Sequence, residues 1–238
     1  MQIYPKKSNI KYIDYLILVP ARSGSKRIKN KNLVNFSGKP LIYWTIKEAK
    51  KINKKSMLVI SSNSKKIIDF CKKNGIYNFI KRPATLSTSE TSTWDVVRHS
   101  LDYYKKNNIL FKNILLLQPT SPLRKISHIS QAINYFERKK LKGLISVSRL
   151  SKPLDWTFSS GKKINFYDKK KYKIFFKKNK KLQDVIPNGA IYIFKVKTLK
   201  IKNFIYQKKV EGFLMDEKFS IDVDTENELK LARYYSQL

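Results

Sequence analysis

The chain has 238 residues, of which 42% are hydrophobic and 13% aromatic, so it can bury the core of one domain and is not a disordered tail. Its 51 lysine and arginine residues outnumber 17 acidic ones, and the formal net charge is +34. No apolar run approaches the roughly 20 residues of a membrane span, and residues 1–14 lack the apolar segment of a secretory signal. The single cysteine, Cys71, excludes an internal disulfide, and no Cys/His cluster suits zinc, so we expect a cytoplasmic protein.

The positive charge favours two classes of partner, nucleic acid and an anionic membrane surface. The lysines are spread over the whole length, however, and aromatic residues are not grouped with arginine. Lysine, asparagine, isoleucine, tyrosine and phenylalanine are abundant together, which is typical of a proteome with A/T-rich codons. We therefore expect no specific nucleic-acid partner, and keep a basic nucleic-acid-binding protein as the alternative from a different class.

Apolar strand-like runs alternate with helical patterns along most of the chain, which predicts βαβ units and a mostly parallel sheet. Pro40 opens one helix at its first turn, Ser92 can cap another, and Thr225 with Glu228 forms a capping box for the last. The expected strands are 15–20, 57–61, 77–80, 113–118, 143–148, 190–194 and 220–224. The expected helices begin at residues 40, 64, 92, 126 and 225.

Residues 151–186 differ from this pattern, because they are rich in lysine and contain a Ser-Ser-Gly turn between strand-like pieces near Trp156 and Phe166. We interpret the segment as an insertion with a β-hairpin inside a single domain that covers residues 1–238.

A polar loop, residues 21–31, follows the first strand, and ligands bind at the carboxyl ends of strands in open α/β sheets. Small residues at 23–25 expose backbone N–H groups, while Arg22, Lys26 and Lys31 supply positive charge, so the loop suits a triphosphate. The loop matches neither a Walker A nor a G-x-G-x-x-G pattern. The alternative is a solvated basic turn in an already basic chain.

Asp222 and Asp224 are two residues apart on a predicted strand, so both carboxylates project from the same face. Such a pair suits a divalent cation that is held by oxygen ligands and bridges phosphate oxygens. The alternative is a polar strand end that leads into the cap at Thr225.

Five collinear segments carry a family resemblance. They are 20–32 (PARSGSKRIKNKN), 82–86 (RPATL), 116–124 (LLQPTSPLR), 187–192 (PNGAIY) and 220–225 (SIDVDT). Together they resemble the CMP-N-acylneuraminate synthetases, or acylneuraminate cytidylyltransferases. The resemblance implies a Rossmann-like nucleotidyltransferase fold, with a mixed, mostly parallel sheet, helices on both faces and a small hairpin insertion. It further implies a homodimer built by the insertion, and transfer of CMP from CTP to a nine-carbon 2-keto sugar acid with Mg²⁺ as cofactor.

The resemblance also assigns roles to individual residues. Arg22 and Lys31 would contact the triphosphate, with Ser25 and Lys26 in the same loop. Asn32 and Arg82 would read the cytidine, Gln118 would contact the sugar, and Asp222 and Asp224 would hold the metal.

Departures from the family pattern lie on the sugar side, so the identity of the sugar is the most open point. Ser89 replaces an acidic residue, and Lys152-Pro153 replaces His-Pro. The lysines at 177, 178, 180 and 181 occupy the region where the family has an arginine that binds the sugar carboxylate. The cluster 177–181 either replaces this arginine or is a solvated charge run. CMP-Kdo synthetase, pseudaminate cytidylyltransferase and a catalytically inactive relative remain alternatives; Gln118 and the PTSP that follows argue against the first two.

Overall fold

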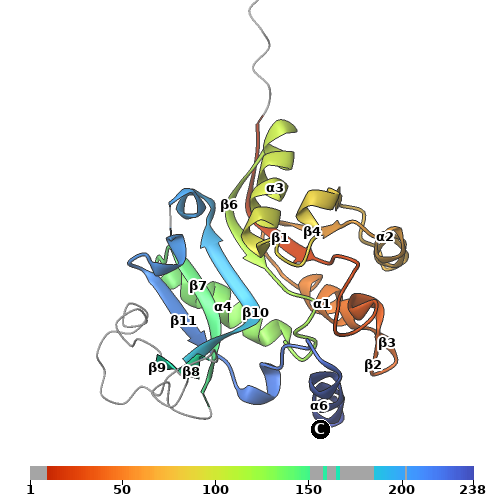
Figure 1. The fold of residues 1–238 in the computed structure, drawn as a ribbon. Coiled ribbons are helices and arrows are strands. Elements are labelled where there is room, and N and C mark those ends of the chain that lie inside the picture. The colour runs from red at the N-terminus through yellow and green to blue at the C-terminus, as the bar shows by residue number, and fades with distance from the viewer. Residues whose placement is uncertain (1–9, 151–157, 160–164, 167–184, 202) are drawn as a thin grey trace, which may run out of the picture.

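A seven-stranded sheet forms the centre of the computed structural model, which describes residues 10–150, 158–159, 165–166, 185–201 and 203–238 (Figure 1). The strand order is β11-β7-β10-β6-β1-β4-β5. Strand β10 is antiparallel to β6 and β7, and the other neighbouring pairs are parallel, which confirms the mixed, mostly parallel sheet. The strands are β1 (Lys11–Pro20), β4 (Ser56–Ser62), β5 (Phe79–Lys81), β6 (Ile109–Leu116), β7 (Gly143–Arg149), β10 (Val185–Lys195) and β11 (Val210–Leu214).

Helices cover both faces of the sheet, as predicted. One face of the sheet is covered by helices α1 (Leu41–Ala49), α2 (Lys65–Lys73) and α4 (Ile126–Arg138). On this face, Ile17 and Val19 of β1 pack with the helices. The alternate residues Leu16 and Leu18 face α3 (Thr93–Lys106) and the 3-10 helices η4 (Val196–Lys200) and η5 (Phe204–Tyr206) on the other side. This continuous apolar alternation is expected of a central strand that is buried on both faces.

A third apolar cluster fixes the last helix, α6 (Glu226–Ser236), against the region around the loop that follows β1. Leu229 of α6 and the buried Val223 before it pack with Ile28 of that loop and with Phe36 of the small β2 (Asn35–Phe36)–β3 (Lys39–Pro40) hairpin. In Figure 1 α6 accordingly lies beside α1 and this hairpin. Residues near the N-terminal end of the domain and the C-terminal helix thus form one apolar cluster.

The predicted helix starts are confirmed. The side chains of Ser64, Ser92 and Thr225 accept hydrogen bonds from the first turns of α2, α3 and α6, and Glu228 completes the predicted capping box. α1 begins at Leu41, directly after Pro40.

The predicted strand at 220–224 is wrong, because these residues belong to no strand of the described sheets. Its amide groups bond elsewhere: the Val223 N–H donates to the Thr120 carbonyl at 2.7 Å, and the Asp224 N–H donates to Glu228 Oε2 at 2.8 Å. Strand β11, which the sequence analysis missed, instead pairs with β7 at the sheet edge.

Within the insertion, β8 (Phe158–Ser159) pairs antiparallel with β9 (Asn165–Phe166), in agreement with the predicted hairpin. The other insertion residues up to 184 lie outside the described residues, and these include Lys152-Pro153 and the lysines at 177–181. Among the described residues, no helix has the length and apolar character to cross a bilayer.

Candidate active site

The loop that follows β1 is held in shape by its own side chains. Asn32 is buried, and its Nδ2 donates to the Arg22 carbonyl at 2.9 Å across the loop. Arg22 Nη1 in turn donates to the Gly24 carbonyl at 2.9 Å, and Gly24 adopts a positive φ of 81° that favours glycine. The Ser23 N–H donates to Asn63 Oδ1 at 2.8 Å, which ties the loop to the end of β4. These bonds give the loop a defined shape, although Gly24, Lys26 and Arg27 are exposed.

A cavity of about 260 Å³ opens beside this loop, at the carboxyl ends of the parallel strands β1, β5 and β6. This edge of an open α/β sheet is where ligands bind. Every site residue predicted from the sequence lines the cavity except Lys26, which is exposed in the same loop. The predicted residues in the lining are Arg22, Ser25, Lys31, Asn32, Arg82, Gln118, Asp222 and Asp224.

Arg82 enters the cavity as a buried cation. Its side chain is 5% exposed, Nη2 donates to the Ser61 carbonyl at 2.8 Å, and Nε donates to Ser61 Oγ at 3.3 Å. Burial lowers the pKa of Arg82 to about 10, and the nearby charge of Arg22 acts in the same direction. The guanidinium is thus charged at neutral pH and held in one orientation by β4.

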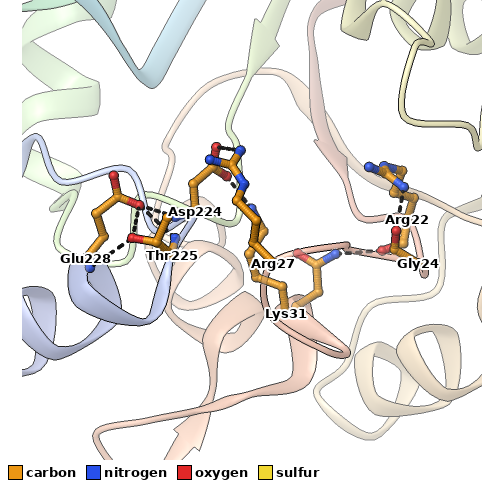
Figure 2. A network of polar contacts seen from close by, with 8 residues as sticks. Arg22, Gly24, Arg27, Lys31, Asp224, Thr225 and Glu228 are labelled. Carbon is orange, nitrogen blue, oxygen red and sulfur yellow. Dashed lines mark hydrogen bonds and ion pairs between the residues drawn. The ribbon is translucent and has the colours of Figure 1, made fainter.

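Asp224 is the centre of an ion network. Lys31 Nζ donates to its Oδ1, and Arg27 Nη2 donates to its Oδ2 at 2.6 Å. Figure 2 shows both cations reaching Asp224 from the loop after β1, with the Thr225–Glu228 cap beside it. Partial burial raises the pKa of Asp224, but the bonds and charges of Lys31 and Arg27 outweigh this effect and hold the pKa below its usual range.

Asp222 has a different environment. Burial raises its pKa, and the charge of Asp224 adds to that rise, although a hydrogen bond with Thr120 and the charge of Lys31 oppose it. Asp222 Oδ1 is buried and has no hydrogen-bond partner among the described residues. An unpartnered carboxylate oxygen in such a place is costly unless a ligand or ion completes it.

The side chains of Gln118 and Asp222 converge on Gly189. A β-carbon at position 189 would lie 3.0 Å from Gln118 Oε1 and 3.1 Å from Asp222 Oδ2, and the φ of Gly189 is +77°. Asn188, also buried, fixes this part of β10: its Oδ1 accepts from Ser146 Oγ at 2.6 Å. The segment around Gly189 is therefore held by hydrogen bonds, as the loop after β1 is.

Comparison with known proteins identifies the family. The family described as Cytidylyltransferase matches residues 16–238, which is nearly the whole chain. The chain belongs to the cytidylyltransferase family.

Three curated relatives of this cytidylyltransferase are named for N-acylneuraminate, legionaminic acid or pseudaminic acid. An N-acylneuraminate cytidylyltransferase of Streptococcus agalactiae serotype V is 32% identical over 90% of the chain, and the chain spans about half (51%) of its length. The CMP-N,N'-diacetyllegionaminic acid synthase of Legionella pneumophila is 32% identical, with 88% of the chain and 90% of the relative covered. The pseudaminic acid cytidylyltransferase of Campylobacter jejuni (serotype O:2) is 28% identical, with 92% and 94% covered.

The solved structure of a CMP:2-keto-3-deoxy-manno-octonic acid synthetase complexed with CTP has the same fold as this cytidylyltransferase. The TM-score is 0.68, and the alignment covers 94% of this chain and 98% of that one. At 15% identity the likeness concerns the fold alone.

One side of the cavity was not predicted from the sequence. It is formed by the segment from η2 (Ala84–Leu86) to the start of α3. A signal was available, since the small polar run STSETST at 87–93 directly follows the RPATL motif. Arg27, whose partner Asp224 is distant in sequence, was not predicted either. The lining residues that were not predicted as site residues are Pro20, Leu86, Thr88, Thr91, Thr93, Val96, Pro119 and Thr120.

The two carboxylates at 222 and 224 are too few for a metal site built from protein ligands alone, but they are enough for a magnesium ion. The part of the chain that the structure describes contains no group of three or more His, Cys, Asp or Glu side chains arranged for a metal. Mg²⁺ typically uses one or two carboxylates and completes its shell with water and substrate phosphates. The unpartnered Oδ1 of Asp222 agrees with this donor set.

Proposed function

We propose that the chain transfers CMP from CTP to the anomeric hydroxyl of a nine-carbon 2-keto sugar acid of the N-acylneuraminate or legionaminate type. A bond forms between the sugar oxygen and the α-phosphorus, the bond to the bridging oxygen of the β-phosphate breaks, pyrophosphate leaves, and the hydroxyl proton is lost. One observation carries the proposal: a single cavity in a cytidylyltransferase gathers the basic loop after β1, the buried Arg82, Gln118 and the two carboxylates.

The loop side of the cavity suits the nucleotide. Arg22 and Lys31 would neutralise the triphosphate, and Ser25 lies beside them in the lining, whereas Lys26 would act only at longer range. Asn32 and Arg82 are buried polar groups, and we assign them to the cytosine. Selectivity would follow because a different base would leave one of these groups unpaired.

Asp222 and Asp224 would hold Mg²⁺, which would supply a positive charge that neutralises the phosphate oxygens during transfer. Lys31 and Arg27 already bond both oxygens of Asp224. Lys31 lines the same cavity, so it would be shared between Asp224 and the triphosphate.

Gln118 faces the sugar in this proposal, and the sugar class follows from it. The Gln-Pro-Thr-Ser-Pro segment differs from the Q-G-D-E-P of CMP-Kdo synthetases, and pseudaminate enzymes tend to have tyrosine in place of Gln118. The Campylobacter relative named for pseudaminic acid nevertheless matches over most of its length, so pseudaminate is the second candidate. The lysines at 177–181 would bind the sugar carboxylate, and single Lys→Ala changes would then raise the KM for the acid alone.

Pyrophosphate release from CTP and Mg²⁺ tests the choice of acid. The panel contains N-acetylneuraminate, N,N'-diacetyllegionaminate, pseudaminate and Kdo. We expect the highest kcat/KM with one of the first two. A preference for pseudaminate would establish the second candidate, and activity with Kdo alone would refute the nine-carbon assignment.

We further propose a cytoplasmic homodimer whose partner contact is built by the insertion at 151–186. The support is the β8–β9 pair, a small sheet separate from the central one, as expected of an added interface element.

A further inference from the structure

Arg124, at the end of the LLQPTSPLR segment, is one of the largest fully buried side chains, with 1% exposed. Its guanidinium joins three parts of the chain. Nη1 donates to the Ala190 carbonyl at 2.6 Å and to the Gln118 carbonyl at 3.2 Å, and Nη2 donates to Thr45 Oγ1 at 2.7 Å. The Thr45 hydroxyl donates onward to the Gln118 carbonyl at 3.3 Å.

These contacts lie where two strands of the sheet separate. The last registered pair of the β6–β10 ladder is Leu116 opposite Tyr192. The same register continued by two residues would place Gln118 opposite Ala190, and the carbonyls of these two residues bond to the same Arg124 nitrogen. Arg124 thus occupies the fork between the strands and sets the distance across it.

Both sides of this fork face the cavity. Gln118 lines the cavity on the β6 side, and Gly189, directly before Ala190, lies against the side chains of Gln118 and Asp222 on the β10 side. The loop that Arg124 closes also accepts the Val223 N–H at the Thr120 carbonyl, between the two carboxylates. The fork is therefore connected to the Gln118 segment, to the Gly189 segment and, through the Thr120 carbonyl, to the segment that carries Asp222 and Asp224.

Burying a cation at such a position costs desolvation free energy. Burial lowers the pKa of Arg124 to about 9, against a smaller opposing effect of Glu48, and Nε has no hydrogen-bond partner among the described residues. Apolar residues of similar volume often replace buried charges without loss of stability. Stability alone therefore does not explain an arginine here. Bonding two carbonyls from Nη1 and the Thr45 hydroxyl from Nη2 does explain it, because this needs several donors held in one rigid plane.

We propose that Arg124 is a positioning residue for the sugar acid: it holds the Gln118 and Gly189 segments at the separation that the acid requires, without touching either substrate. The inference rests on the proposed function, in which Gln118 faces the sugar. Nucleotide binding depends on the opposite wall and is predicted to be independent of Arg124.

The test compares Arg124→Met, Arg124→Lys and Thr45→Val with wild type, and uses the exposed Arg138→Met on α4 as the matched control. KM for the acid and for CTP are measured well below each melting temperature. We expect Arg124→Met to raise the KM for the acid about tenfold or more while the KM for CTP stays within about twofold, since small misplacements of a binding group have large effects. Arg124→Lys should lie between Arg124→Met and wild type. Thr45→Val should shift the same KM by a smaller factor.

Equal changes in both KM values, or a lower melting temperature with both KM values unchanged, would overturn the positioning role. If Arg124→Met does not fold, Thr45→Val decides, and an unchanged KM for the acid then refutes the proposal. If the wild type accepts no sugar acid, the proposed function fails instead. Hydrogen exchange then tests, without any substrate, whether Arg124 holds the Gln118 and Gly189 segments together. Arg124→Lys must speed amide exchange at 118–121 and 188–191 but not in α2. Uniformly faster or unchanged exchange contradicts the positioning role.

Discussion

Asp224 and Lys31, which the sequence assigned to the metal and the triphosphate, bond to each other in the structure. Each charge compensates the other, and the exposed Arg27 adds a second cation to the same carboxylate. The pair of the exposed Arg27 with Asp224 contributes at most about 1 kcal/mol to the free energy of unfolding. The Lys31 side chain is 14% exposed and that of Asp224 36%, so their pair is partly buried, and both residues line the cavity.

Asp224→Asn tests the role proposed for Asp224. We expect kcat to fall about 100-fold or more, because a cation ligand worth several kcal/mol of transition-state stabilisation is weakened. EDTA should abolish wild-type activity, and Mg²⁺ should restore it. Glu226→Gln, a nearby exposed carboxylate in the first turn of α6, is the control and should remain active. A fully active Asp224→Asn enzyme would leave the pair with a structural role only.

Arg82→Lys tests the assignment of the base-binding wall. Lysine keeps the charge but loses the planar fork that bonds Ser61 and, in our proposal, the cytosine. We expect the KM for CTP to rise about tenfold to 100-fold, which corresponds to one charged hydrogen bond. The KM for the sugar acid should be unchanged. Arg98→Lys, an exposed change on α3, is the control, and a parallel rise of both KM values would count against the assignment.

Among the elements, the cap of α6 connects stability to the site. Glu228 Oε2 accepts the N–H groups of Asp224 and Thr225, so the same capping box that starts the helix also orients Asp224. The cap of α2 at Ser64 makes the same kind of bond away from the cavity lining.

Thr225→Ala and Ser64→Ala therefore form a matched pair. Both should lower the free energy of unfolding by about 1 kcal/mol in denaturant titrations, the usual effect of losing an N-cap. Only Thr225→Ala should also reduce kcat, because only that cap holds Asp224. Equal kcat values for the two variants would show that the cap does not orient the site.

The strands and helices were predictable where the chain makes local choices. The caps at Ser92 and Thr225 and the apolar run of β1 are local signals, and the structure confirms them. The cap at Ser64 was not predicted, because Ser64 was expected to be the first residue of the helix that it caps. The alternation of apolar and polar residues at 220–224 predicted a strand, but the same alternation occurs here in a segment that pairs with no strand. Val223 is fully buried between the two carboxylates, while its N–H bonds a loop and not a neighbouring strand. Pairing partners are long-range facts that a local pattern does not contain.

The same limit applies to the site. The motifs predicted most of the cavity residues because those residues belong to contiguous segments. The pairing of Arg27 with Asp224, and the convergence of Arg124, Gln118 and Ala190, join residues from distant segments or across the end of a strand ladder. Only the fold brings these groups together.

We expect the protein to form a dimer in which the insertion at 151–186 makes the partner contact. Light scattering should give a mass near twice the 28.0 kDa of the chain, in a buffer with enough salt to screen the +34 charge. Replacing 152–184 by a short linker should yield a monomer whose melting temperature stays close to that of wild type. A wild-type monomer with full activity would contradict this prediction.

The most direct test of the central claim is a competition between nucleotides. The enzyme, Mg²⁺ and the best sugar acid of the panel are mixed with equal concentrations of CTP and UTP, and the products are identified by mass spectrometry. We expect a CMP-linked sugar acid with one pyrophosphate released per product, and almost no UMP-linked sugar. Comparable amounts of the two sugar nucleotides, or pyrophosphate release without a CMP-linked sugar, would contradict it.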